Sequence, residues 1–311
     1  MKSNLKPLTV KVTIGICVKN DAELIKKAMA SILGQSFPAE LTELLIVDGC
    51  SRDGTLEIIK ESLKGHNIRT QIFQENSGLG IARQIVVDKA NGEYITWVDS
   101  DMVLPPNYIK NHVQFMDEHP LVGIAGGKYT VHLGNGLAAD LENVVYAVDS
   151  LYGEKSVSKF GFLPGTEGST FRVEAIRQVG GFDVRINGAA EDTEVAYRIK
   201  AKGWKIAIIN EVFTESTRQS WLSLWQQYNW YGRGAHFIFH KDPNTVSIWK
   251  LMPLMGLFAG FLRFPYAYLL TKKKGVILLP FHYAYKRLAW FFGFFSAHLK
   301  GYGHFKNKAN S

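Results

Sequence analysis

The chain has 311 residues, of which 46% are hydrophobic and 21% charged, with a formal net charge of +8. This composition is ordinary for a globular protein of one large domain with an appendage or of two modest domains, and it excludes a low-complexity or repeat protein. The charge is uneven, because residues 241–311 contain eleven Lys and Arg against one acid, Asp242. That segment has a net charge of +10, which leaves −2 for residues 1–240.

The chain has two cysteines, Cys17 and Cys50, without the spacing of a metal site. We expect both to be reduced, buried thiols of a cytosolic protein. The first twenty residues lack the apolar core of a signal peptide. We therefore expect the protein to stay in the cytoplasm. Together with the basic C-terminal segment, this predicts a location at the cytoplasmic face of a membrane.

Short apolar runs alternate with amphipathic segments over the first hundred residues. Strands are expected at 10–18, 44–47, 68–73 and 94–98, and helices at 21–33, 55–63 and 78–89. This alternation predicts an α/β fold with a mostly parallel sheet flanked by helices on both faces. Asp53 is expected to cap the helix that begins near Thr55.

Polar clusters follow four of the predicted strands. They are Lys19-Asn20-Asp21, Asp48, Asn76 and Asp99-Ser100-Asp101. Because ligands bind at the carboxyl ends of the strands in parallel sheets, we expect these clusters to converge on one edge. Two carboxylates one residue apart at a strand end, Asp99 and Asp101, are able to share one hard cation with phosphate oxygens.

A second acidic pair, Glu191-Asp192, begins a helix predicted over 191–202. A carboxylate there is suited to accept the proton of an attacking hydroxyl, and Asp192 is the candidate base, with Glu191 positioning its neighbours. Arg83 follows the Asn76-Ser77-Gly78 turn. Its side chain either faces a diphosphate or pairs with a surface acid, and the sequence leaves both open.

Taken in order, these segments resemble a family 2 glycosyltransferase with the GT-A fold, over roughly residues 9–234. The segments that carry the resemblance begin at Ile46-Val47-Asp48-Gly49, Asn76-Ser77-Gly78, Ala90-Asn91-Gly92-Glu93, Asp99-Ser100-Asp101, Phe171-Arg172, Gly180-Gly181-Phe182-Asp183 and Glu191-Asp192.

The resemblance implies an inverting transfer from a nucleotide-sugar donor with Mg²⁺ or Mn²⁺. It implies that Asp48 contacts the base of the nucleotide, that Asp99 and Asp101 bind the metal and that Asp192 acts as the base. The whole set of expected donor-binding residues is Lys19, Asn20, Asp48, Asn76, Arg83, Asp99 and Ser100.

Three departures from the family pattern qualify this assignment. Many relatives have a second acid where this chain has Gly49. The stretch 212–215 has no His, which leaves the third metal contact open. The Gln-x-x-Arg-Trp motif of processive synthases is absent from 226–231, which indicates the transfer of one sugar per binding event.

Residues 236–311 are predicted to form a basic, aromatic-rich helical region that follows a catalytic domain of residues 1–235. The apolar segments 251–262 and 288–297 favour lipid over nucleic acid, and Lys272-Lys273-Lys274 suits anionic headgroups. A spanning hairpin would place Arg263 near the middle of the membrane and the three lysines outside, so helices lying in the interface are favoured over it.

A membrane-bound transferase implies a lipid-linked acceptor. A sugar hydroxyl needs a base such as Asp192, whereas a polyprenyl phosphate does not, and the hydroxyl is the favoured nucleophile. Two other classes stay open at this stage: a non-catalytic adaptor that binds nucleotide or glycan, and a nucleotidyltransferase that shares the sheet and the metal-binding acids.

Overall fold

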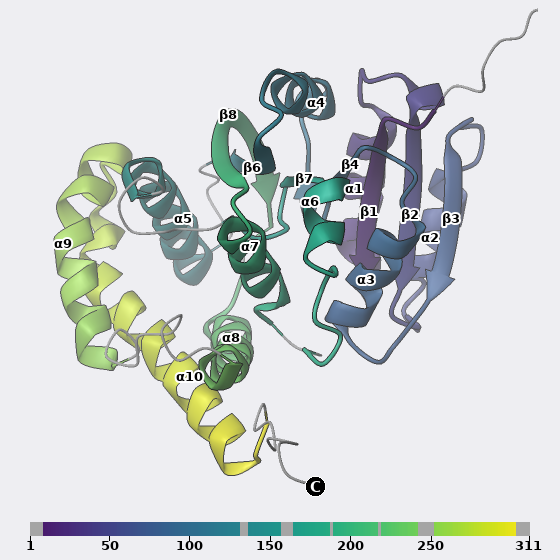
Figure 1. The fold of residues 1–311 in the computed structure, drawn as a ribbon. Helices are drawn as coiled ribbons and strands as arrows, with labels where there is room; N and C mark the ends of the chain where they lie inside the picture. The colour runs from purple at the N-terminus through teal and green to yellow at the C-terminus, as the bar shows by residue number, and fades with distance from the viewer. Residues whose placement is uncertain are drawn as a thin grey trace, which may run out of the picture. The chain divides into compact units, whose positions relative to one another are not determined.

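The structure is a computed structural model, which describes residues 9–130, 136–156, 164–186, 189–216, 219–241 and 252–302 (Figure 1). The chain divides into two compact units. Unit 1 consists of Met1–Thr130, Glu154–Asn187 and Asp192–Ser216, and unit 2 of Val131–Gly153, Gly188–Glu191 and Thr217–Ser311. The predicted division by function at residue 235 stays a prediction, and helix α8 (Trp221–Lys241) runs across that position.

Unit 1 contains a sheet of eight strands among its described residues, in the order β3-β2-β1-β4-β7-β6-β8-β5. The strands are β1 (Val12–Val18), β2 (Thr42–Asp48), β3 (Arg69–Gln74), β4 (Tyr94–Trp97), β5 (Met102–Val103), β6 (Val122–Tyr129), β7 (Thr170–Arg172) and β8 (Lys205–Glu215). Strands β1 to β4 are parallel to one another, and β8 is parallel to β6. Strand β7 is antiparallel to β4 and β6, and β5 is antiparallel to β8. The mostly parallel sheet is therefore confirmed.

Helices cover both faces of this sheet because successive side chains of each buried strand point to opposite sides. The helices of this unit are α1 (Ala22–Leu33), α2 (Thr55–Ser62), α3 (Leu79–Lys89), α4 (Tyr108–Glu118), α6 (Val173–Gln178) and α7 (Glu191–Ala201), with the short 3₁₀ helix η1 (Ala39–Leu41). Leu44 and Ile46 belong to a core with α1, α2 and α4, whereas Leu45 and Val47 belong to a core with α3, α6 and α7. The result is a three-layer α/β/α unit.

The strand order places β1 beside both β2 and β4. Chain order therefore reverses between β1 and β4, with β2 and β3 on one side and β4 on the other. Open α/β sheets bind ligands at such a switch point, outside the carboxyl ends of the strands. The ends of β1 and β4 are the places where the sequence has Lys19-Asn20-Asp21 and Asp99-Ser100-Asp101.

Unit 2 is helical. It contains α5 (Leu137–Ser156), α8, α9 (Pro253–Thr271), the short 3₁₀ helix η4 (Lys274–Leu278) and α10 (Leu279–Leu299). A small apolar core joins α5, α9 and α10, and its buried members are Leu141, Val144, Val145, Val148, Ala267, Val276, Leu279 and Tyr283. By length and hydropathy, α9 is the one helix of the described residues that is able to cross a membrane.

The helices α9 and α10 are longer than the two apolar segments predicted for this region. Leu251, where the first segment was expected to begin, lies outside the described residues, and α9 continues through Arg263 and Pro265 to Thr271. Arg263 lies within α9, and its guanidinium lies over the ring of Tyr283, 5.3 Å from the centroid.

One prediction about the cysteines is wrong. Cys17 is half-buried, but Cys50 is exposed, in a loop where its φ is 57°. The residue follows the last position of β2 rather than continuing the strand, so its side chain has left the buried layer.

Candidate active site

The loops that follow β1 and β2 hold each other in place. The backbone N–H of Asn20 donates to Ser51 Oγ at 2.9 Å, and Asn20 Oδ1 accepts from the N–H of Arg52 at 2.9 Å. A Cβ on Gly49 would lie 2.8 Å from Lys19 Cβ, so the lysine stem packs against the glycine. The small residue at position 49, where relatives often have an acid, therefore makes room for Lys19.

Asp48 ends β2 with a buried side chain. Its carboxylate accepts hydrogen bonds from the N–H of Ser51, at 3.3 and 3.1 Å to its two oxygens, and from Gln74 Nε2 at 3.2 Å. Asp48 thus shapes the loop beside the expected base-binding position. Asn76 is exposed two residues after the end of β3, at the same edge of the sheet. Whether Asp48 and Asn76 contact a donor stays a prediction.

Asp53 has the structural role expected of it. Its Oδ1 accepts from the N–H and hydroxyl of Thr55 at 3.1 and 2.6 Å, and its Oδ2 accepts from the N–H of Ala22 at 3.0 Å. These bonds lower the pKa of the exposed Asp53 carboxyl. One carboxylate thus ties together the N-terminal ends of α1 and α2.

The switch point between β1 and β4 is bridged by a short side-chain hydrogen bond. Ser100 Oγ, in the turn after β4, donates to Asp21 Oδ2 after β1. Asp21 directly precedes α1, but its side chain makes no capping bond to that helix. Because Asp21 holds Ser100 in this way, the Asp99-Ser100-Asp101 turn is fixed against the loop after β1.

Five carboxylates gather at this edge of unit 1. They belong to Asp99, Asp101, Glu167, Asp192 and Glu215, and each lies close enough to at least one of the others to affect its ionisation. The structure therefore brings Asp99, Asp101 and Asp192 into one cluster, as predicted. Arg83, buried on α3, places Nη2 at 3.5 Å from Asp99 Oδ1, so it pairs with an acid of the cluster.

Gly165 is part of what allows the acids to approach. A Cβ at this position would lie 2.1 Å from Glu167 Oε2 and 2.5 Å from Asp192 Oδ2. The other oxygen of Asp192 accepts from the N–H of Thr193 at 2.6 Å, in the first turn of α7. The carboxylate of Asp192 is thus oriented by the helix with one oxygen directed toward the backbone of Gly165. Glu191 is buried and belongs to unit 2, and its role stays a prediction.

Burial and the charges of neighbouring acids make ionisation of Asp99, Glu167 and Glu215 costly. Burial raises the pKa of Asp99, the Arg83 guanidinium lowers it and the charge of Asp192 raises it, with a raised pKa as the result. The pKa of Glu167 is raised by burial and then by Asp192 and Asp99. The pKa of Glu215 lies well above its usual value because of burial and the charges of Asp101, Glu167 and Asp99.

Two of the five acids were not among the predicted site residues. Glu215 ends β8, and the antiparallel pair of β5 with β8 places it opposite Met102, next to Asp101. Glu167 lies in a loop between Gly165 and Gly168, and the hydroxyl of Tyr129, at the end of β6, lies within hydrogen-bonding reach of both Glu167 and Glu215. In the sequence, the one indication of a site role for Glu167 was its position between Gly165 and Gly168. For Glu215 the signal was its place in the stretch where the third metal contact was sought.

The donor set fits a hard divalent cation. Glu215 Oε2 is buried and has no hydrogen-bond partner among the residues that the structure describes. Buried carboxylate oxygens of this kind need a cation or a proton. Mg²⁺ and Mn²⁺ prefer oxygen ligands, and Asp99, Asp101 and Glu215 supply them from three different positions of the chain.

The sequence profile described as "Glycosyl transferase family 2" matches residues 13–175, which contain β1 to β4 and the Asp99-Ser100-Asp101 turn. The chain belongs to glycosyltransferase family 2. The enzyme class predicted from the sequence is confirmed with it.

Curated relatives have related activities in their names. The chain is 22% identical over 294 residues to the poly-beta-1,6-N-acetyl-D-glucosamine synthase of Staphylococcus epidermidis, covering 89% of this chain and 68% of that protein. It is 31% identical over 150 residues to the putative teichuronic acid biosynthesis glycosyltransferase TuaG of Bacillus subtilis, covering 48% of this chain and 56% of that protein.

A solved structure has the same fold. It is the mannosyltransferase PcManGT of Pyrobaculum calidifontis in complex with GDP-Man and Mn²⁺, with a TM-score of 0.58 at 17% identity. The likeness covers 93% of this chain and 73% of that one. The predicted GT-A fold is therefore confirmed.

Proposed function

We propose that this glycosyltransferase moves one sugar, with inversion, from a nucleotide-sugar donor to a hydroxyl of a lipid-linked glycan at the cytoplasmic face of a membrane. The observation that carries the proposal is the group of five carboxylates beside Arg83 at the switch point of the sheet. Such a group is costly to bury unless a cation or a reaction uses it.

The first part of the proposal is the binding of the donor diphosphate. Asp99, Asp101 and Glu215 would hold Mg²⁺ or Mn²⁺, and that ion would neutralise charge on the leaving diphosphate. Arg83 approaches Asp99 from α3 and is placed to orient the same group. Lys19, Asn20, Asp48, Asn76 and Ser100 follow the neighbouring strands and are proposed to contact the nucleotide and its sugar. The Mn²⁺ and GDP-Man bound to PcManGT support this choice of ligands.

The second part is the removal of a proton from the acceptor. In an inverting transfer the acceptor oxygen forms its bond to the anomeric carbon while the bond from that carbon to the diphosphate breaks. The hydroxyl proton passes to Asp192, whose carboxylate is oriented by the N–H of Thr193. Glu191, the preceding residue, is proposed to position neighbouring groups. The leaving group departs as a nucleoside diphosphate, so charge and atoms balance.

The third part is the membrane. Unit 2 exposes a large apolar surface on α9 and α10, whose exposed members include Leu254, Met255, Phe258, Phe261, Leu262, Leu269, Leu270, Phe281, Phe292, Phe295 and Leu299. Surfaces of this size on a single chain indicate a lipid or protein partner. Lys272 and Lys274 are exposed at the C-terminal end of α9, where they suit anionic headgroups. We propose that both helices lie in the interface, and that this location supplies a lipid-linked glycan, in keeping with the polysaccharide-related names of the relatives.

The decisive experiment compares donor hydrolysis in wild type and Asp101→Ala with Mn²⁺ present. We expect a preferred nucleotide sugar, identified by thermal stabilisation in a panel of donors, to be hydrolysed by wild type at least ~100-fold faster than by the variant. Equal rates would overturn the proposed metal site. Transfer to polyprenyl phosphate but to no glycan hydroxyl would overturn the proposed acceptor. Loss of binding to anionic vesicles in Lys272→Glu with Lys274→Glu, but not in the exposed Lys64→Glu control, tests the membrane part.

A further inference from the structure

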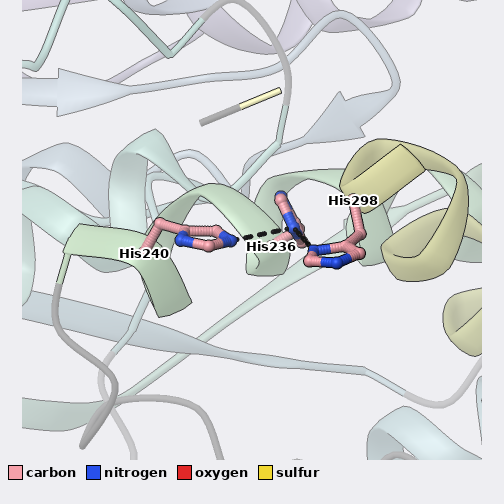
Figure 2. Close-up of side chains that lie close together, drawn as sticks. All are labelled: His236, His240 and His298. Carbon is pink, nitrogen blue, oxygen red and sulfur yellow. Dashed lines mark hydrogen bonds between the residues drawn. The ribbon is translucent and has the colours of Figure 1, made fainter. Parts of the chain in front are cut away.

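Three histidines of unit 2 direct ring nitrogens to one point. His236 and His240 lie one turn apart on α8, and His298 lies near the end of α10. His236 Nε2 is 3.2 Å from His298 Nδ1 and 3.1 Å from His240 Nε2, and the three ligand atoms all lie within 4.8 Å of one another. Figure 2 shows the ring of His236 between those of the other two. The transfer proposed above uses none of them.

Two of these separations, 3.2 and 3.1 Å, are close to those of ligands around a tetrahedral metal. With Zn–N bonds of about 2.0–2.1 Å, two nitrogens at the tetrahedral angle lie ~3.3 Å apart. The spacing of four residues between His236 and His240 places both imidazoles on one face of α8, as a helical chelate requires. The third ring comes from a different helix, which closes the site in three dimensions.

The hydrogen bond of His236 explains which of its nitrogens is available. His236 Nδ1 lies 2.6 Å from the backbone oxygen of Tyr302. A carbonyl oxygen only accepts, so Nδ1 is the protonated nitrogen and Nε2 has the lone pair. One in-plane lone pair accepts one N–H well, yet Nε2 lies within hydrogen-bond distance of two ring nitrogens. A cation that all three lone pairs bind resolves this crowding.

The carbonyl of Tyr302 is itself held in place. The ring of Tyr302 packs against Phe237, with ring centroids 5.7 Å apart. A histidine ligand typically donates its second N–H to a carbonyl or carboxylate, which fixes the ring and raises its basicity. The contact from His236 to Tyr302 thus has the form of the outer shell of a metal site.

Close packing of α8 on α10 supports the site. A Cβ on Gly232 would lie 2.0 Å from Trp290 O, and a Cβ on Gly293 would lie 1.9 Å from Asn229 O. The two helix backbones are therefore in contact about one turn before His236 and His298. The imidazoles meet because the glycines leave no side chain between the helices.

We propose that His236, His240 and His298 bind one Zn²⁺ ion, with a fourth position for water, and that the ion joins α8 to the end of α10. Three neutral imidazoles suit Zn²⁺ far better than Mg²⁺ or Mn²⁺, which prefer oxygen. His298 is exposed and His236 is buried, so an ion enters from the surface and is bound beneath it. The zinc site is thus separate in chemistry from the carboxylate site of unit 1.

The test uses the full chain, freed of metal with a chelator and titrated with Zn²⁺. We expect wild type to bind one Zn²⁺ per chain, and His240→Ala and His298→Ala each to weaken the binding by at least ~10–100-fold. His66→Ala, which changes an exposed histidine of unit 1, is the matched control and is expected to bind as wild type does. Zn²⁺ should raise the melting temperature of wild type and of this control, but not of the other two variants.

Two further measurements test the proposal even if a histidine variant folds poorly. X-ray absorption at the zinc edge of the wild-type protein should show three imidazole nitrogens, and a shell of oxygens alone would overturn the site. Zinc binding should survive Asp101→Ala and a large excess of Mg²⁺. Loss of the tight Zn²⁺ site in Asp101→Ala, with unchanged affinity in the histidine variants, would assign the ion to the carboxylates and overturn the proposal.

Discussion

Each unit has a glutamate at the centre of a polar cluster, and the two clusters are opposite in character. In unit 2, Glu142 accepts from Tyr228 Oη at 2.7 Å, lies 2.8 Å from Lys286 Nζ and accepts from His282 Nε2 at 2.7 Å. In unit 1, Glu167 lies among Asp99, Asp192 and Glu215. Burial raises the pKa of both glutamates. At Glu142 the Lys286 charge and the His282 hydrogen bond outweigh burial and bring the pKa to about 2. At Glu167 the charges of Asp192 and Asp99 add to burial and help to raise the pKa to about 7.

The comparison distinguishes a cluster whose compensated charges stabilise the fold from one whose repelling charges destabilise it. The carboxylate of Glu142 has a donor on each oxygen and a lysine beside it, so its charge is compensated within unit 2. The carboxylates around Glu167 repel one another. Among the ion pairs of the described residues, the one that involves any of these five acids joins Arg83 to Asp99. A group of carboxylates that repel one another is typical of sites that bind a cation or move a proton.

The largest expected effect is on catalysis. Asp192→Asn should lower kcat by roughly 10²–10⁴-fold, because the amide cannot accept the proton of the acceptor hydroxyl. Donor binding, followed by thermal stabilisation, should change little. Asp88→Asn, which alters an exposed acid on α3, is the control. A full rate in the variant would remove Asp192 from the mechanism.

The next effect is on stability and concerns unit 2. Glu142→Ala should lower the free energy of unfolding by about 3 kcal/mol, because it leaves Lys286 charged and buried without its carboxylate. Adding Lys286→Met should recover part of the loss, since it removes the unpaired charge. Urea unfolding of the single and double variants measures both changes. A loss below about 1 kcal/mol would show that the cluster is only weakly coupled to the fold.

The charge of Glu142 also predicts a dependence on pH. Its pKa in the fold, about 2, lies below the ordinary value of 4.5, so its contribution is present above pH ~4.5 and is lost as the pH falls toward 2. The stability difference between wild type and Glu142→Gln should therefore be constant near neutral pH and shrink by about 3 kcal/mol on acidification. Denaturation at several pH values checks this, with the exposed Glu61→Gln as control. A difference that grows in acid would contradict the sign.

The smallest expected effect is a gain in stability. Glu167→Gln should raise the free energy of unfolding by about 1 kcal/mol at pH 8 in the absence of divalent ions, because it removes one of several repelling charges. Mn²⁺ should reduce the advantage of the variant, since the cation offsets the same repulsion in wild type. Thermal unfolding with chelator and with Mn²⁺ measures the two differences. A destabilised variant under both conditions would show that Glu167 is a structural acid like Glu142.

Much of unit 1 was predictable because its signals are local. Alternating apolar runs and amphipathic segments placed β1 to β4 and α1 to α3 to within a few residues of their observed ends. Asp48 and Asp99 were expected at strand ends, and both lie there. Strands β1, β2 and β4 are almost wholly buried, so most of the polar residues beside them lie in the turns that follow.

Unit 2 was less predictable. Its apolar segments indicated helices and an exposed lipid-like surface, but the extent of α9, from Pro253 through Arg263 to Thr271, was not predicted. The buried partners of Glu142 come from α8 and α10, up to 144 positions away. Pairings over such distances leave no trace in periodicity, because each partner alone has the pattern of an ordinary polar residue on a helix.

By itself, therefore, the sequence determined the class of the sheet, the edge where its polar clusters lie and the family to which the chain belongs. Tertiary structure alone decided that Glu215 reaches Asp101 through the pair of β5 with β8, that Glu167 joins them, and that His298 meets His236. The physical reason is that secondary structure depends on neighbours within a few residues, whereas a site for a cation needs charges from distant segments. Only the packing of strands and helices brings such segments together.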